Sequence, residues 1–149
     1  ARDRKLSTIL GTNTRDTKRI REQFLGNLPS FKSLKDRVAR AATKKFLKGL
    51  DGRKLIIRSE HSALNTLLQG AGSIVMKQAL VLFRNYIKDL DAKIVANVHD
   101  EWQVEVIEEQ AEEVGKRGIQ AIIDAGVVLK LNCPLNGEYN VGNNWSETH

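Results

Sequence analysis

The sequence predicts an α+β fold, in which an antiparallel sheet packs against long helices and a basic helical segment comes first. Two hairpin signals support the sheet: Asp51-Gly52 between strand-like flanks, and two strand-like runs, 94–99 and 102–107, with only two residues between them. Apolar residues at helical spacing support the helices, and the longest such stripe covers residues 62–90. This order of helices and hairpins favours an antiparallel sheet.

Length and composition indicate a soluble globular protein. The 149 residues suffice for one ordinary domain, with 41% hydrophobic and 28% charged residues. A single cysteine, Cys133, cannot form an internal disulfide, which indicates a reducing compartment. No apolar stretch approaches the roughly 20 residues of a membrane span, and the N-terminus lacks the apolar core of a signal peptide. We therefore expect a cytoplasmic protein without a membrane partner.

The charge of the chain is distributed unevenly. The 24 Lys and Arg against 18 Asp and Glu give a net charge of +6. The positive excess lies within residues 1–58, whereas residues 99–149 are net acidic. A basic half of this kind attracts polyanions, of which nucleic acid is the first candidate and anionic lipid a weaker one.

The basic half is predicted to begin with two helices. Helical spacing covers residues 14–25, which Gly26 should end, and Pro29 should open the next helix at a permitted first-turn position. The following hairpin places Arg53 and Arg58 on or beside its turn. These cations suit a nucleic-acid backbone, but an ordinary solvated basic hairpin explains them equally well.

The long helix over residues 62–90 contains two glycines, Gly70 and Gly72, which cost roughly 1 kcal/mol each relative to Ala and indicate close approach by another group. Asn65 and Gln69, four residues apart, form a strip of uncharged hydrogen-bonding groups on one face. Such a strip suits the minor groove, whose acceptors occur in every base pair. The alternative is a satisfied polar seam between two helices.

Elements after the second hairpin are predicted from the same rules. Residues 108–125 show the pattern of an amphipathic helix with an acidic first turn. Residues 127–131 and 135–141 have the composition of strands, separated by turn residues.

The tip of the second hairpin carries Asp100 and Glu101, directly after His99. Two-residue loops favour Asn-Gly or Asp-Gly, so Asp-Glu is a poor choice for a turn. Strict alternation places apolar groups on both faces of the first arm, which predicts a hairpin covered on both sides. Local rules that fail inside a consistent pattern suggest a functional site, although a solvated acidic loop is an equal alternative.

Four blocks of the chain resemble a known family. The blocks "REQFLGNLPSF", "LDGRKLIIRSEHSALNTLLQGAGSIVMKQAL", "VHDEWQVEV" and "VGNNW", in this order and spacing, resemble the C-terminal part of family A (Pol I-like) DNA polymerases. The replicative polymerases of short-tailed bacteriophages are the most similar. The resemblance covers nearly the whole chain.

The resemblance implies a role for each residue of the tip. Asp100 is expected to be one of two carboxylates that hold the catalytic magnesium ions, and Glu101 to lie beside the primer terminus and support the metal site. His99 is expected to contact the primer end. Asn65 and Gln69 would touch the minor groove of newly formed base pairs, in agreement with the strip described above.

The resemblance also implies contacts along the duplex and a division of the chain. Arg53, Arg58 and His61 would lie along the duplex. Residues 1–48 resemble the C-terminal part of the fingers, and residues 49–149 the C-terminal part of the palm.

Two motifs of the family do not occur in this sequence: the motif with the other metal-binding aspartate, and the fingers helix that holds the incoming nucleotide. We therefore expect a fragment that is inactive alone and completes a two-ion Mg²⁺ site with the N-terminal part of the polymerase, on primer-template DNA and deoxynucleoside triphosphates. The setting would be a bacterial host cell or a prophage. The alternative is a non-catalytic, DNA-binding remnant of a polymerase gene.

Overall fold

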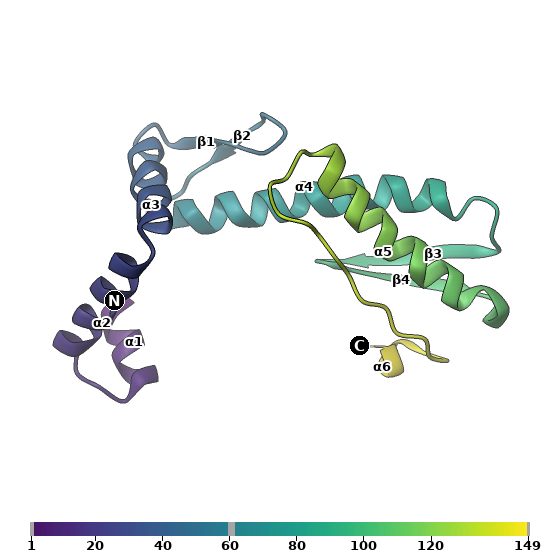
Figure 1. Ribbon diagram of the computed structural model, residues 1–149, viewed down its shortest axis with the longest axis horizontal. Helices are drawn as coiled ribbons and strands as arrows, with labels where there is room; N and C mark the ends of the chain where they lie inside the picture. Colours follow the sequence, from purple (N-terminus) through teal and green to yellow (C-terminus); the bar gives the residue numbers. More distant parts are fainter. Residues whose placement is uncertain (1, 60–61, 149) are drawn as a thin grey trace. The chain divides into compact units, whose positions relative to one another are not determined.

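The computed structural model describes residues 2–59 and 62–148 and shows the predicted mixture of helices and hairpins (Figure 1). The α+β class is confirmed. The elements are α1 (Arg2–Leu10), α2 (Thr14–Asn27), α3 (Pro29–Ala42), β1 (Phe46–Lys48), β2 (Lys54–Ile56), α4 (Ala63–Tyr86), β3 (Ala92–Val98), β4 (Glu101–Val106), a 3-10 turn (Glu108–Gln110), α5 (Ala111–Val128) and α6 (Trp145–Thr148). The strands form two separate sheets of two strands, β1-β2 and β3-β4.

The chain divides into two compact units. The first consists of Ala1–Leu47 and Ile56–Asn65, and the second of Lys48–Leu55 and Thr66–His149. The division into fingers-like residues 1–48 and palm-like residues 49–149 stays a prediction.

The first unit begins with helices α1, α2 and α3. Helix α1 was not predicted, whereas α2 begins where expected because the Asn13 side chain accepts a hydrogen bond from the Asp16 amide at 2.8 Å. The prediction that Gly26 ends this helix was wrong, since α2 continues to Asn27. Pro29 opens α3 as expected. The apolar side chains buried in this unit are those of Val38, Ala42, Leu47, Ile57 and Ala63.

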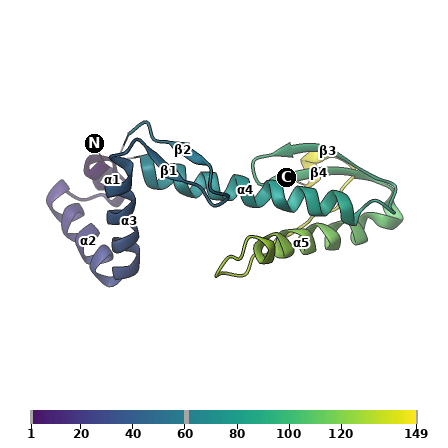
Figure 2. The same ribbon diagram turned by 90° about the horizontal axis from the view of Figure 1, so that it is seen from above.

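The core of the second unit lies between α4, α5 and the β3-β4 hairpin, which lie side by side in Figures 1 and 2. Phe83 and Ile87 of α4 are buried with Val114 and Ala121 of α5. The Phe83 ring stacks on Trp102 of β4 with 4.9 Å between ring centroids and 11° between ring planes. This stack fixes one face of the hairpin against the helices.

A β-bulge changes the faces that alternation predicted for β3. Ile94 pairs with Val104 and Ala96 with Gln103, so Val95 is the extra residue. Beyond the bulge Asn97 lies opposite Trp102. The prediction that Ile94, Ala96 and Val98 share one face was therefore wrong, because Ala96 and Val98 face away from the helices together with Gln103 and Glu101.

Helix α5 is longer than predicted, and the strand expected over residues 127–131 is wrong. The helix continues to Val128 and ends in a Schellman motif, in which the Leu131 amide donates to the Gly126 carbonyl and the Lys130 amide to the Val127 carbonyl, both at 3.0 Å. Lys130 occupies the left-handed position with φ 54°. A lysine does not predict such a helix end from sequence, because glycine is the usual residue at this position.

The segment after α5 also contains no strand, contrary to the prediction for residues 135–141. It packs against α5 as an extended chain. A Cβ atom added to Gly115 would lie 2.3 Å from the Tyr139 ring, and one added to Gly126 would lie 3.0 Å from Leu135. The small residues of α5 therefore admit this segment into direct contact with the helix.

Arg117 of α5 joins the helix to the end of α4. Its Nη1 donates to the Tyr86 carbonyl and to Asp89 Oδ1, both at 2.5 Å, and its Nε donates to Glu113 Oε1 at 2.7 Å. The hydrogen bond from Arg117 holds the pKa of Asp89 below its usual value.

Helix α4 is, by length and composition, long and apolar enough to cross a membrane. The expectation that no apolar stretch approaches the length of a membrane span was therefore wrong. Phe83 of this helix belongs to the core cluster, and Leu82 and Tyr86 pack against that cluster. A core helix of a soluble protein passes the same length and composition test.

Candidate active site

The turn between β3 and β4 contains His99 and Asp100. Val98 pairs with Glu101, so Glu101 is the first residue of β4. The predicted loop of Asp100 and Glu101 was wrong by one residue, since the two loop residues are His99 and Asp100. His99 has φ 55°, whereas Asp100 is not among the residues with positive φ. A positive φ at the first of two loop residues in a hairpin normally belongs to glycine, asparagine or aspartate.

A histidine at that position carries a conformational cost. Left-handed backbone costs a residue with a side chain roughly 1–2 kcal/mol, although histidine tolerates it better than most. Such strain persists where the surrounding structure imposes it, and it concentrates at functional sites. The stacked and paired hairpin supplies that constraint, and the turn projects His99 and Asp100 as exposed side chains.

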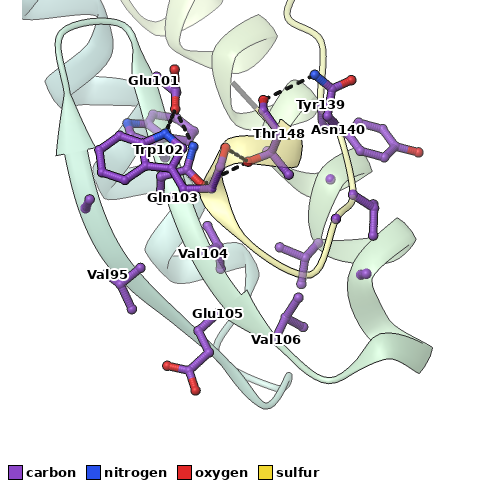
Figure 3. A pocket seen from close by; sticks show the side chains of 18 of the residues that line it. Val95, Glu101, Trp102, Gln103, Val104, Glu105, Val106, Tyr139, Asn140 and Thr148 are labelled. Atoms are coloured by element: carbon purple, nitrogen blue, oxygen red, sulfur yellow. Dashed lines mark hydrogen bonds between the residues drawn. The ribbon is translucent and has the colours of Figure 1, made fainter.

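Glu101 differs from Asp100 because it lies in the strand and is partly buried. Its Oε1 accepts a hydrogen bond from Trp145 Nε1 at 3.0 Å and another from Gln103 Nε2. Gln103 Oε1 in turn accepts from Thr148 Oγ1 at 3.4 Å (Figure 3). The C-terminal helix α6 is thereby tied to the outer face of β4.

These partners of Glu101 were missed by the sequence analysis. "VGNNW" contributed to the family resemblance but received no role, since nothing local indicates that Trp145 contacts a residue 44 positions earlier. Gln103 could have been found, because strand periodicity puts it on the same face as Glu101.

A groove of about 810 Å³ lies beside the carboxylates. Its lining combines the hairpin, α5 and the C-terminal segment, and includes Asp100, Glu101, Tyr139 and Trp145. Figure 3 labels Glu101 and Tyr139 on this lining. Trp102 also lines it, and the buried Trp102 Nε1 has no hydrogen-bond partner among the residues that the structure describes. Within 2–59 and 62–148, no group of three or more His, Cys, Asp and Glu side chains is arranged to hold a metal.

The residues assigned to the minor groove lie on α4. Asn65 and Gln69 are exposed and one helical turn apart, as the spacing predicted. Gly70, next to them, admits Leu55 of β2, because an added Cβ would lie 3.0 Å from Leu55 Cδ1. The close approach inferred from this glycine is therefore made by the protein itself. The minor-groove role of Asn65 and Gln69 stays a prediction.

The two arginines assigned to the duplex lie in and just after the β1-β2 hairpin. Arg53 Nε lies 2.5 Å from Asp51 Oδ2, and both Arg53 and Arg58 are exposed. Partial desolvation raises the pKa of Asp51, but its hydrogen bonds and ion pair with Arg53 outweigh this and lower the pKa overall. His61 lies outside the described residues, and the roles of Arg53, Arg58 and His61 stay predictions.

Comparison with known proteins identifies the family. The model of DNA polymerase family A matches residues 1–147. The chain therefore belongs to DNA polymerase family A, which confirms the resemblance seen in the sequence.

Individual relatives include phage and bacterial enzymes. The chain is 35% identical to a DNA-directed DNA polymerase of Escherichia phage Phieco32 and 32% identical to that of Escherichia phage T7, with 100% of this chain aligned in both cases. It covers 26% and 25% of those two proteins, about a quarter of their length. DNA polymerase I of Pseudomonas aeruginosa is 30% identical over 97% of this chain and 17% of its own length.

A solved structure has the same fold. The POL domain of Pol1 from M. smegmatis, in complex with DNA primer-template and dNTP, superposes with a TM-score of 0.72 at 25% identity. The match covers 80% of this chain and 24% of that chain.

Proposed function

We propose that this chain is the C-terminal palm portion of a template-directed DNA polymerase and supplies Asp100 and Glu101 to its two-metal nucleotidyl-transfer site. The observation that carries the proposal is the strained hairpin tip, which presents two adjacent carboxylates in a chain of DNA polymerase family A. The relatives described as DNA-directed DNA polymerases, and the neighbour bound to primer-template DNA and dNTP, support DNA and nucleotides as partners.

The residues of the tip fit Mg²⁺ in ligand type. Magnesium prefers oxygen ligands and keeps several of its waters, so a few rigidly placed carboxylates suffice. When bound, two such ions would neutralise the charge that develops on the transferred phosphoryl group and on the attacking and leaving oxygens. Asp100 would hold metal directly from the turn, Glu101 would support it from the strand, and His99 would contact the primer end.

The same donor set explains why the chain would be inactive alone. Asp100 and Glu101 supply two neighbouring carboxylates from one hairpin, and the described residues contain no group of three metal-ligating side chains. The second aspartate and the binding site for the deoxynucleoside triphosphate would come from the N-terminal part of the polymerase. We propose that this part is the protein partner.

Exposed polar and basic groups would hold the primer-template. Asn65 and Gln69 can accept and donate hydrogen bonds in the minor groove without reading sequence, because its acceptors are shared by all base pairs. Arg53, Arg58 and the basic N-terminal helices would contact phosphates, which bind without sequence preference.

A chimeric enzyme tests the proposal. The quarter of the T7 phage relative that aligns with this chain is replaced by it, and primer extension is measured with Mg²⁺ and the four deoxynucleoside triphosphates. We expect DNA synthesis that Asp100→Asn reduces by at least about 100-fold, since even groups that only orient a metal ligand are worth roughly 10- to 100-fold.

The control is Glu109→Gln, which neutralises an exposed acid of the 3-10 turn after the hairpin and should leave synthesis unchanged. A folded chimera that binds primer-template but extends nothing would instead identify the chain as a DNA-binding remnant. Equal activity of the Asp100→Asn chimera would remove Asp100 from the site.

A further inference from the structure

We infer that Trp145 is a positioning residue, which sets the orientation of the Glu101 carboxylate through its indole N–H. The inference rests on the proposed function, because it concerns the carboxylate that would support the metal site. Its geometric basis is the hydrogen bond of 3.0 Å from Trp145 Nε1 to Glu101 Oε1. This contact joins the final helix of the chain to the first residue of β4.

The C-terminal segment reaches β4 from a fixed anchor. Tyr139 lies against Gly115 of α5, and its hydroxyl donates to Glu112 Oε2 at 2.5 Å. This hydrogen bond raises the pKa of Tyr139 above its usual value. The chain that carries Trp145 therefore starts from a point attached to α5.

Helix α6 is also held by hydrogen bonds of its own. Glu147 accepts from the Asn143 amide at 2.8 Å and from Asn144 Nδ2 at 2.6 Å. Asn140 Nδ2 donates to the Thr148 carbonyl at 3.3 Å. These bonds order the residues on both sides of Trp145, so little additional entropy is lost when its indole N–H meets Glu101.

Two donors converge on one oxygen of Glu101. Trp145 approaches from α6 and Gln103 from the same strand, and Gln103 also accepts from Thr148 of α6. A glutamate side chain has several rotatable bonds, and it supports a metal site well only when hydrogen bonds from its surroundings select one orientation. Trp145 as a residue is 48% exposed, so its contact contributes more to orientation than to stability.

Trp145→Phe removes the N–H donor and keeps an aromatic ring in place. Ser146→Ala is the matched control, because Ser146 is the exposed neighbour in α6. Two properties are measured in the intact chain. The first is measured without metal: NMR three-bond couplings report how far the Glu101 side chain averages between rotamers. In the same metal-free state, the chemical shift of the Trp145 indole N–H is compared between the wild-type chain and Glu101→Gln. The second is the affinity of the hairpin tip for Mn²⁺.

We expect Trp145→Phe to increase rotamer averaging at Glu101 and to weaken Mn²⁺ binding by about 10-fold, the lower end of the range for groups that orient a metal ligand. Glu101→Gln should shift the indole resonance, and Ser146→Ala should change nothing. Unchanged Glu101 couplings in Trp145→Phe would overturn the inference, whether or not the tip binds metal. Altered couplings with no Mn²⁺ binding in the wild-type chain would uphold the positioning role and count against the proposed metal site.

Discussion

Each of the two hairpin connections contains a residue with positive φ, but this residue is a glycine in one hairpin and a histidine in the other. In the β1-β2 connection the positive φ of 85° falls on Gly52, and Asp51 caps the loop by accepting from the Arg53 amide at 3.2 Å. In β3-β4 the positive φ of 55° falls on His99, which has no such freedom. The first hairpin follows local turn rules, whereas the second violates them.

The difference separates a structural turn from a candidate site. Under the proposed function, the basic side chains in and beside the glycine turn would contact phosphates from a solvated surface. Under the same proposal, Asp100 in the histidine turn and Glu101 beside it would have to be rigidly placed. They belong to a hairpin whose Trp102 stacks on Phe83. A turn that breaks its local rule on a well-packed support is therefore the better place to seek chemistry.

The largest expected effect is the salt dependence of duplex-DNA binding by the basic residues of the β1-β2 hairpin and the N-terminal helices. If about four phosphates are contacted, affinity should fall roughly 100-fold between about 50 and 200 mM salt, since each contact releases counterions. Arg58→Ala should lower the slope of log K against log salt by about 1, whereas Asp100→Asn should leave the slope unchanged. Fluorescence anisotropy with unrelated duplexes measures this. Affinity that is insensitive to salt, or limited to one sequence, would contradict it.

Gly52→Ala should destabilise the chain by about 1–2 kcal/mol, because alanine has to adopt the left-handed conformation that glycine now occupies. Urea unfolding followed by circular dichroism gives the free energy of unfolding. Gly72→Ala is the control, since a methyl group added to this helical glycine would meet open space, with nothing within 4 Å. That variant should be neutral or stabilising.

His99→Gly should stabilise the chain, whereas Gly52→Ala should destabilise it. Glycine removes the strain at φ 55° but adds freedom to the unfolded chain, so a net gain of up to about 1 kcal/mol is expected. The same urea experiment measures it. A loss of stability would show that His99 makes contacts that compensate for its backbone conformation, and the contrast between the hairpins would then lose its basis.

The smallest expected effect is on the pH dependence of stability, through the ion pair of Asp89 with Arg117 of α5. The pKa of Asp89 is lowered by its hydrogen bond from Arg117. The ion pair of Asp89 therefore stabilises the folded chain fully when the pH is above 3.8, the pKa of Asp89 in the unfolded chain. This stabilisation is lost as the pH falls through the lower pKa of Asp89 in the folded chain. Asp89→Asn should flatten the decline of unfolding free energy below about pH 4, and Asp36→Asn on α3 serves as control. An unchanged acid profile in Asp89→Asn would exclude this pair as a contributor.

Local chemistry in the sequence predicted much of the fold. Pro29 and the Asp51-Gly52 pair located a helix start and a hairpin correctly because each fixes backbone angles by itself. The end of α5 could not be predicted, since Lys130 has no intrinsic preference for the left-handed position that it occupies. Packing of Leu135 and Tyr139 on α5 then replaced the expected strands with an extended segment.

The candidate site was predictable only where residues are neighbours in sequence. Asp100 and Glu101 are adjacent, so their shared position was evident from the sequence. The turn was placed one residue too late, because a histidine gives no signal of the positive φ that it adopts there. The bulge at Val95 likewise leaves no mark in the alternation. Trp145 and Glu101 meet through tertiary packing, which no local periodicity encodes.

The most direct test of the metal-site proposal is an NMR titration of the intact chain with Mn²⁺. Paramagnetic broadening should begin at His99 to Trp102 and only at high metal concentration, because the chain supplies few of the ligands that a divalent ion needs. Asp100→Asn should abolish it. The acidic cluster of Glu108, Glu109, Glu112 and Glu113 serves as an internal control, since it offers exposed carboxylates without a turn that orients them. Broadening that starts on this cluster and spares the hairpin tip would contradict the assignment of Asp100 as a metal ligand.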